Sequence, residues 1–149
     1  MSIIYLDSSA LVKRYIAEPG SNIIKETYRK ALNGDLKLAS STWNIGEVLG
    51  VLDKYLTKGF LTEQDYKLAK LQFIAETIKL IKLRIIKLIP VKTRILIQTW
   101  PLIQKHHIYI ADALQITSAK TVKTENFYTG DEELNEIANK EGLKTTLLK

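Results

Sequence analysis

A single acidic residue interrupts an apolar helical segment in the stretch YIADALQI, residues 109–116. That residue is Asp112, and Ile108 and Ile116 lie one helical turn before and after it, so its carboxylate falls on or beside a buried face. An isolated ionised carboxylate is costly to bury, and buried charges are normally paired, protonated or bound to a metal. The sequence therefore predicts that other groups of the chain, or a cation, surround Asp112.

Length and composition favour a single domain, residues 1–149, that is soluble and cytoplasmic. A chain of this size buries about 68–70% of its unfolded surface without covalent staples. The absence of Cys excludes a thiol nucleophile and a thiolate zinc site, and the adjacent His106 and His107 are poorly spaced to bind one metal from a helix. No apolar run approaches the roughly 18 residues of a membrane span, and the first residues lack the charged start of a signal peptide.

The net charge of +6 is unevenly distributed along the chain. Residues 64–94 contain eight basic residues and two acids, whereas residues 125–141 contain six acids and one Lys. A basic face suits a polyanion such as a nucleic acid, but a solvated surface is the commoner meaning of such a run. Charge alone therefore leaves both interpretations open.

Apolar runs alternate with amphipathic segments through the whole chain. The expected strands are residues 3–6, 36–40, 85–89, 126–129 and 144–148. Seven helices are expected. The first follows the first strand and stops at Pro19, and the second stops at Asn33. The third covers 42–58, the fourth begins at 62, the fifth covers 92–105, the sixth runs from around Asp112 to Lys120 and the seventh covers 131–141. Pro101 should kink or break the fifth. The second of these helices should bury Ile23, Ile24, Thr27, Ala31 and Leu32. The alternation predicts a three-layer α/β/α fold with a mainly parallel central sheet of about five strands.

Four acids are candidates for a common site, and each has a plain structural explanation when taken alone. Asp7 ends the first strand and could cap the following helix, and Glu47 could be an ordinary solvated helix residue. Asp131 could cap the last helix, although the pattern Thr129-x-x-Glu132 resembles a capping box that would leave Asp131 free. Asp112 is the hardest to explain by structure alone, because of its apolar surroundings.

Three of these acids share a position relative to the expected sheet. Asp7, Glu47 and Asp131 follow the first, second and fourth strands, and the carboxyl ends of parallel strands meet at one edge, where ligands collect. Carboxylates about 4 Å apart repel by about 4 kcal/mol at an effective dielectric of 20, so a proton, a basic side chain or a cation must lie among them. Oxygen ligands without Cys or suitably spaced His favour Mg²⁺ or Mn²⁺ over Zn²⁺.

The segments around these acids resemble the four motifs of PIN domains, in the right order and over essentially the whole chain. They are YLDSSALV around Asp7, NIGEVL around Glu47, IADALQI around Asp112 and YTGDEEL around Asp131. The short form of the chain is similar to VapC-type toxins of prokaryotic toxin–antitoxin pairs. The resemblance implies that Asp112 joins the other three acids at the sheet edge.

The resemblance also implies a Mg²⁺- or Mn²⁺-dependent ribonuclease with Asp7, Glu47, Asp112 and Asp131 as its acidic, metal-binding site. Ser9 and Thr129 match the small polar positions that support these carboxylates. A homodimer and an antitoxin that inserts a basic side chain into the acidic pocket are further implications.

The residues themselves suggest how such a site would act on RNA. Asp7, Asp112 and Asp131 would be metal ligands, and Glu47 a ligand or a base that orients water. Basic residues on the flanking helices could contact phosphates, although a solvated surface explains each of them singly: Lys13, Arg14, Lys54 and Lys58. The alternatives are a PIN-like module that binds RNA or protein without cleaving, and a nuclease that processes RNA without a toxin role.

Overall fold

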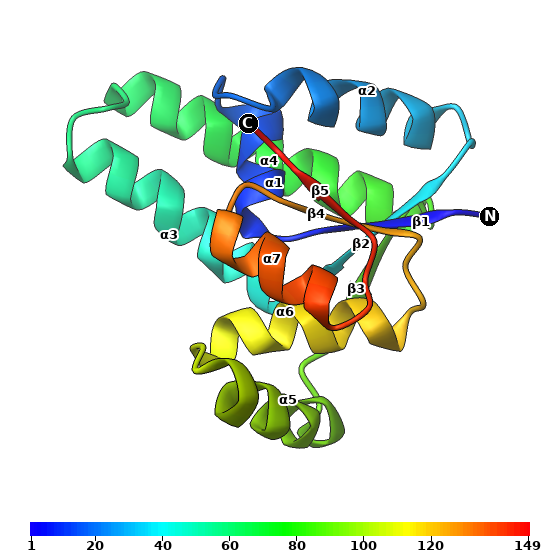
Figure 1. Cartoon of the computed structure of the whole chain (residues 1–149). Helices are drawn as coiled ribbons and strands as arrows, with labels where there is room; N and C mark the ends of the chain where they lie inside the picture. Colours follow the sequence, from blue (N-terminus) through cyan, green and yellow to red (C-terminus); the bar gives the residue numbers. More distant parts are fainter.

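The computed structural model describes residues 1–149 as five strands and seven helices that largely alternate (Figure 1). The strands are β1 Ile3–Leu6, β2 Lys37–Ser41, β3 Ile86–Ile89, β4 Asn126–Thr129 and β5 Thr145–Leu147. The helices are α1 Ser8–Tyr15, α2 Ser21–Leu32, α3 Trp43–Thr57, α4 Glu63–Lys82, α5 Thr93–His106, α6 Ile110–Thr121 and α7 Glu132–Lys140. All five strands and all seven helices correspond to segments expected from the sequence, with boundaries that shift by a few residues.

The five strands form one parallel sheet in the order β3-β2-β1-β4-β5. β1 occupies the centre, as its continuous apolar run predicts, and its Tyr5 pairs in register with Ala39 of β2 and Phe127 of β4. The predicted α/β fold with a parallel sheet is therefore confirmed. Because all strands run the same way, the segments that leave their carboxyl ends meet at one edge of the sheet.

Two hydrophobic cores lie on opposite faces of the sheet. Ile4 and Leu6 of β1 pack with buried residues of α1, α2, α3 and α4, whereas Tyr5 packs with buried residues of α5, α6 and α7. This alternation follows from the two-residue period of a strand. Figure 1 accordingly shows the helices divided between the two sides of the sheet, which gives the three predicted layers.

The structure corrects two expectations about the helices in part. Of the predicted kink or break at Pro101, the break does not occur, because α5 continues from Thr93 to His106 while Ile95 and Leu102 pack into the core shared with α6. This packing maintains the helix although the proline removes one backbone donor. In α2 the buried residues are Ile24, Thr27, Tyr28 and Ala31. Tyr28 takes the place of the expected Ile23 and Leu32, which are 39% and 48% exposed.

None of the seven helices combines the length and the apolar composition needed to cross a bilayer.

Candidate active site

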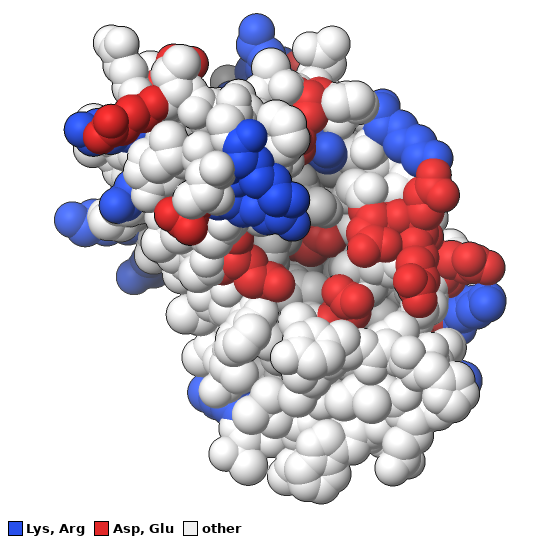
Figure 2. All heavy atoms as spheres, turned by 90° about the vertical axis from the view of Figure 1, so that its left-hand side faces the viewer, with Lys and Arg blue, Asp and Glu red and all other residues white.

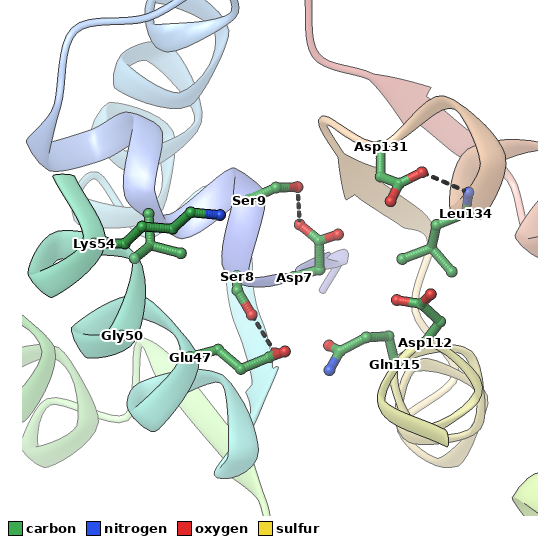
Figure 3. A pocket seen from close by; sticks show the side chains of 11 residues that line it. Asp7, Ser8, Ser9, Glu47, Gly50, Lys54, Asp112, Gln115, Asp131 and Leu134 are labelled. Carbon is green, nitrogen blue, oxygen red and sulfur yellow. Dashed lines mark hydrogen bonds between the residues drawn. The ribbon is translucent and has the colours of Figure 1, made fainter. Parts of the chain in front are cut away.

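The four candidate acids line one cavity of about 360 Å³ at the carboxyl ends of the strands (Figure 3). Asp7 directly follows β1, Glu47 lies early in α3, Asp112 lies in the first turn of α6, and Asp131 precedes α7. The segments that follow β1, β2 and β4 thus supply three of the acids, as expected from the strand ends. The fourth reaches the cavity from α6, which packs across the opposite face of the sheet from α1 and α3.

Asp7 is buried and held by three hydrogen bonds. Its Oδ1 accepts from the Ser9 hydroxyl at 2.6 Å and from the Ala10 backbone N–H at 2.9 Å, and its Oδ2 accepts from the Thr129 hydroxyl at 2.5 Å. The bond from Ala10 makes Asp7 the N-cap of α1, so Asp7 both caps this helix and lines the cavity. Burial raises the pKa of the Asp7 carboxyl to about 6, although these hydrogen bonds oppose the shift.

Ser9 and Thr129 connect the loops that carry Asp7 and Asp131. The Ser9 hydroxyl accepts a hydrogen bond from the Gly130 N–H at 2.7 Å while it donates to Asp7. The Thr129 hydroxyl accepts from the Asp131 N–H at 3.1 Å while it donates to Asp7. Each hydroxyl therefore fixes the Asp7 carboxylate relative to residues 129–131, which end β4 and lead into α7.

Of the two caps that the sequence allows for the last helix, the structure shows Asp131 and not Thr129. The Asp131 carboxylate caps α7 itself, because its Oδ1 accepts from the Leu134 N–H at 3.0 Å. The hydroxyl of Thr129 is committed to Asp7 instead. A carboxylate has about four acceptor positions, so this single bond leaves most of the acceptor capacity of Asp131 available in the cavity.

Glu47 is held from the opposite wall of the cavity. Its Oε1 accepts a hydrogen bond of 2.5 Å from the hydroxyl of Ser8, which lies on α1. Figure 3 shows this bond between the two helices. Because the Ser8 oxygen in turn accepts from Asn44 Nδ2 at 3.1 Å, its proton is directed toward Glu47.

Asp112 stands opposite Glu47 and has the least compensated charge of the site. Burial raises the pKa of its carboxyl, and the negative charges of Asp131, Glu47 and Glu133 raise it further. No hydrogen-bond donor is among the groups that act on it. Its surroundings match the expectation from the sequence that this carboxylate needs a cation or a proton.

A buried polar network that the sequence argument missed lies beneath the cavity. Gln115, one turn after Asp112, accepts hydrogen bonds at its Oε1 from the Tyr5 hydroxyl at 2.6 Å and from Asn44 Nδ2 at 2.9 Å. Asn44 also donates to Ser8. The sequence contains one sign of this network: Asn44 is a polar residue on the buried face of α3, one turn before Val48. This network connects β1, α3 and α6 at the base of the cavity.

The four basic candidates have different surroundings. Lys54 lines the cavity, and Figure 3 shows its ammonium directed toward it. Lys13 pairs with Glu18 at 3.2 Å, and Arg14 donates two hydrogen bonds to Glu76, so neither lines the cavity. Lys58 is an exposed residue at the end of α3 and is also outside it. Figure 2 shows the acids gathered around a hollow with few blue side chains beside it.

The donor set of the cavity suits a hard divalent cation. Carboxylate oxygens are the ligands that Mg²⁺ and Mn²⁺ prefer. Burial, and after it the charge of Asp131, raises the pKa of the Asp7 and Asp112 carboxyls, so their charged forms are disfavoured unless a cation joins them. Nevertheless, no three acidic or histidine side chains of the protein are arranged closely enough to chelate an ion as they stand. The chemistry of the cavity thus fits a metal, while a closed chelate is not formed by the protein alone.

The parallel sheet and the acidic cavity at the carboxyl ends of its strands define an α/β protein with its ligand site at the sheet edge. The sequence matches the PIN domain over residues 4–140, and the chain belongs to the PIN-domain family. PIN domains are nucleases, which places this protein among hydrolases that act on nucleic acids.

Solved structures of the same fold include toxins and toxin–antitoxin complexes. VapC20 of Mycobacterium tuberculosis, a toxin that cleaves the sarcin–ricin loop, has a TM-score of 0.63 at 15% identity, and the match covers 94% of this chain and 95% of that one. VapBC2 of Rickettsia felis, bound to a promoter DNA fragment, has a TM-score of 0.61 at 16% identity and 99% coverage of both chains. FitAcB of Neisseria gonorrhoeae has a TM-score of 0.64 at 16% identity and 95% coverage of both. A comparison with functionally curated proteins gave no match.

Proposed function

We propose that this chain is a Mg²⁺- or Mn²⁺-dependent endoribonuclease and the toxin of a VapBC-type toxin–antitoxin pair. The observation that carries the proposal is the cavity in which Asp7, Glu47, Asp112 and Asp131 meet with only Lys54 as a cation in its lining. A structural cluster of four acids would be paired with bases, as Glu76 is with Arg14 and Glu141 is with Lys105 and Lys120. Family membership and the fold of known toxins support the same proposal.

Each residue of the cavity has a definite part in this mechanism. Asp7, Asp112 and Asp131 would hold the cation, and Ser9 and Thr129 would keep the Asp7 carboxylate in a fixed orientation. Glu47, fixed by Ser8, would bind the cation or accept a proton from the attacking water. Lys54 would contact an RNA phosphate at the rim. When bound, the cation would supply hydroxide near neutral pH and stabilise negative charge on the phosphate.

Cleavage of a labelled single-stranded RNA by the purified protein tests the enzymatic part. The wild type should cleave with Mg²⁺ or Mn²⁺ and stop when EDTA is added. Asp112→Asn should abolish cleavage while it keeps the fold, because it preserves the shape and removes the charge. Glu63→Gln is the matched control, since it neutralises an exposed carboxylate on α4, where Glu63 pairs only with Lys67. Wild-type cleavage that persists in EDTA and in Asp112→Asn would refute the proposal and favour a module that binds without cutting.

Expression of the chain alone tests the toxin role. The wild type should arrest growth and break cellular RNA in the cytoplasm, and Asp112→Asn should do neither. An antitoxin that places a basic side chain among the four acids would suppress the arrest, since the cavity contains little positive charge of its own. Cleavage in vitro without any growth arrest would favour a role in RNA processing instead.

An apolar surface on α5 supports the proposed homodimer. Residues 95–104 contain no charged side chain, and Ile97 and Trp100, which share a helix face, are 47% and 56% exposed. Figure 2 shows the surface below the acidic cavity almost free of charge. Large exposed apolar patches of this kind usually mark interaction sites. Trp100→Lys should therefore convert a dimer into a monomer in light scattering, and a wild type that is already monomeric would contradict the assignment.

A further inference from the structure

The side-chain amide of Gln115 is buried against the catalytic cavity with its donors unused. The residue is 3% exposed and lines the cavity, yet its Nε2 has no hydrogen-bond partner in the protein. In Figure 3 the amide lies between Glu47 and Asp112, the acids on opposite walls. A buried amide N–H without an acceptor is unfavourable, so its place in a ligand cavity calls for an acceptor that arrives with the ligand.

The hydrogen-bond network fixes which end of this amide is the donor. Asn44 Oδ1 accepts from the Ser41 backbone N–H at 3.0 Å, so the nitrogen of Asn44 must face Gln115. That nitrogen donates to Gln115 Oε1 at 2.9 Å, as does the Tyr5 hydroxyl at 2.6 Å. The Nε2 of Gln115 therefore carries the two free N–H groups.

Few other side chains of the cavity can donate. The Ser8 hydroxyl donates to Glu47 and the Ser9 hydroxyl donates to Asp7, which leaves Lys54 and Gln115 as the lining side chains with unused donors. An N–H group cannot bind a metal ion, because both are electron-pair acceptors. It needs an oxygen of the substrate, and among the oxygens of RNA those of the phosphate are the strongest acceptors.

We propose that Gln115 Nε2 donates a hydrogen bond to a non-bridging oxygen of the RNA phosphate that enters the acidic cavity. The inference rests on the proposed ribonuclease function and names a further substrate-binding residue of the same site. A neutral donor suits this position, since a second cation beside Asp112 and Glu47 would compete with the metal. Tyr5 and Asn44 orient the amide and do not touch the substrate themselves.

Gln115→Met tests the proposal, because methionine is similar in size, neutral and without a donor. Loss of a hydrogen bond to a charged group should raise KM for RNA roughly ten- to hundredfold and raise the Kd for a short single-stranded RNA by a similar factor. The Kd is measured by fluorescence anisotropy in the Asp112→Asn background, so that binding is read without cleavage. Affinity for Mn²⁺, measured by calorimetry without RNA, should stay unchanged.

Gln64→Met is the matched control, because it makes the same substitution at an exposed glutamine on α4 that lies outside the cavity. It should keep the RNA affinity of the wild type. Gln115→Leu is a second variant in case the methionine protein does not fold, since leucine is also neutral and without a donor.

The outcomes separate this inference from the proposed function. A wild type that cleaves RNA, beside a Gln115→Met variant with unchanged KM and Kd, would overturn the inference alone. An equal loss of RNA affinity in Gln64→Met, or a loss of Mn²⁺ affinity in Gln115→Met, would also overturn it, by showing that the effect is not specific to the buried amide or that it acts through the metal. A wild type that neither cleaves nor binds RNA would overturn both.

Discussion

Glu76 on α4 and Asp112 on α6 are both half-buried carboxylates, and their surroundings are opposite. Glu76 accepts two hydrogen bonds of 3.0 Å from the Arg14 guanidinium and one of 2.8 Å from the Tyr15 hydroxyl. Burial raises the pKa of Glu76, but these bonds more than offset it, and the pKa lies below its usual value. For Asp112 burial and three neighbouring acids act in the same direction, and the pKa is raised.

The difference distinguishes a carboxylate that stabilises the fold from one that is available for a ligand. Glu76 joins α1 to α4 through its bonds to Arg14 and Tyr15, and Arg14 also lies over the ring of Tyr28 at 4.6 Å. Asp112 joins nothing, and its repulsion from Asp131 and Glu47 is a cost that a bound cation would remove. The lack of a basic partner is what the proposed role of Asp112 as a metal ligand requires.

A basic side chain placed in the cavity, like the Arg14 guanidinium that pairs with Glu76, should produce the largest effect, a loss of RNA cleavage. Gly50 lines the cavity on α3, and a Cβ atom added there meets no heavy atom within 4 Å outside the helix's own backbone. An arginine in Gly50→Arg should lie among the acids, compete with the metal and lower RNA cleavage roughly a hundredfold or more. It should also stabilise the helix by about 0.8 kcal/mol, because glycine is a poor helix former. Cleavage rates and urea unfolding measure the two effects.

Thr57→Arg is the control for this variant, since it adds the same charge to the exposed end of the same helix. It should leave cleavage near the wild-type rate. Full activity in Gly50→Arg would mean that positive charge in the cavity does not disturb the site, and the contrast with Glu76 would lose its functional meaning.

Adding a divalent cation to the metal-free protein should stabilise it through the acidic cavity alone. Binding to the folded state at a hundred times the Kd contributes about 2.7 kcal/mol, which raises the melting temperature by several degrees. The shift should appear in the wild type and in Glu76→Gln, and it should be lost in Asp112→Asn. Differential scanning fluorimetry with Mn²⁺ and with EDTA gives the comparison, and an equal shift in all three proteins would place the binding elsewhere.

Removing the charge of Glu76 should lower stability and leave RNA cleavage unchanged, which is the reverse of what is expected for Asp112. Glu76→Gln leaves the partly buried Arg14 without its counter-ion and should lower the free energy of unfolding by about 2 kcal/mol. RNA cleavage by the folded protein should be unchanged, because Glu76 lies outside the cavity. In Asp112→Asn the free energy of unfolding should instead stay the same or rise slightly, since a repulsive charge is removed. Urea unfolding of both variants decides this, and a larger loss in Asp112→Asn would be the contrary result.

The last comparison concerns pH, and the effects differ in sign between Asp7 and Glu141. The pKa of Asp7 is raised to about 6, so its contribution to the stability of the metal-free protein is full below about pH 4 and is lost as the pH rises through 6. Hydrogen bonds from His106, Lys105 and Lys120 lower the pKa of Glu141 to about 2, so its contribution is present above about pH 4.5 and is lost as the pH falls toward 2.

Urea unfolding in EDTA between pH 2 and pH 7 measures both slopes. Asp7→Asn should remove the decline above pH 4, and Glu141→Gln should remove the decline below pH 4.5. If either variant kept the slope assigned to its residue, that assignment would be wrong.

Much of the fold follows from the sequence because it depends on local patterns. The continuous apolar run of residues 3–6 predicts a central strand, and alternation of strands and helices predicts a parallel sheet, whose topology brings Asp7, Glu47 and Asp131 to one edge. Local patterns fail where a distant contact competes. Pro101 remains inside α5 because the packing of that helix holds it, and Thr129 gives its hydroxyl to Asp7 although the sequence around it resembles a capping box.

By itself, then, the sequence determined the sheet, its carboxyl edge and the acids that belong there, because strand period, helix stripe and strand ends are properties of neighbouring residues. Only the tertiary structure decided which charged groups meet. It pairs Arg14 with Glu76, leaves Asp112 without a partner, and brings the amide of Gln115 beneath the cavity beside Asn44. These pairings join residues that lie far apart in the chain, and an electrostatic environment depends on distance in space, to which separation in sequence gives no direct guide.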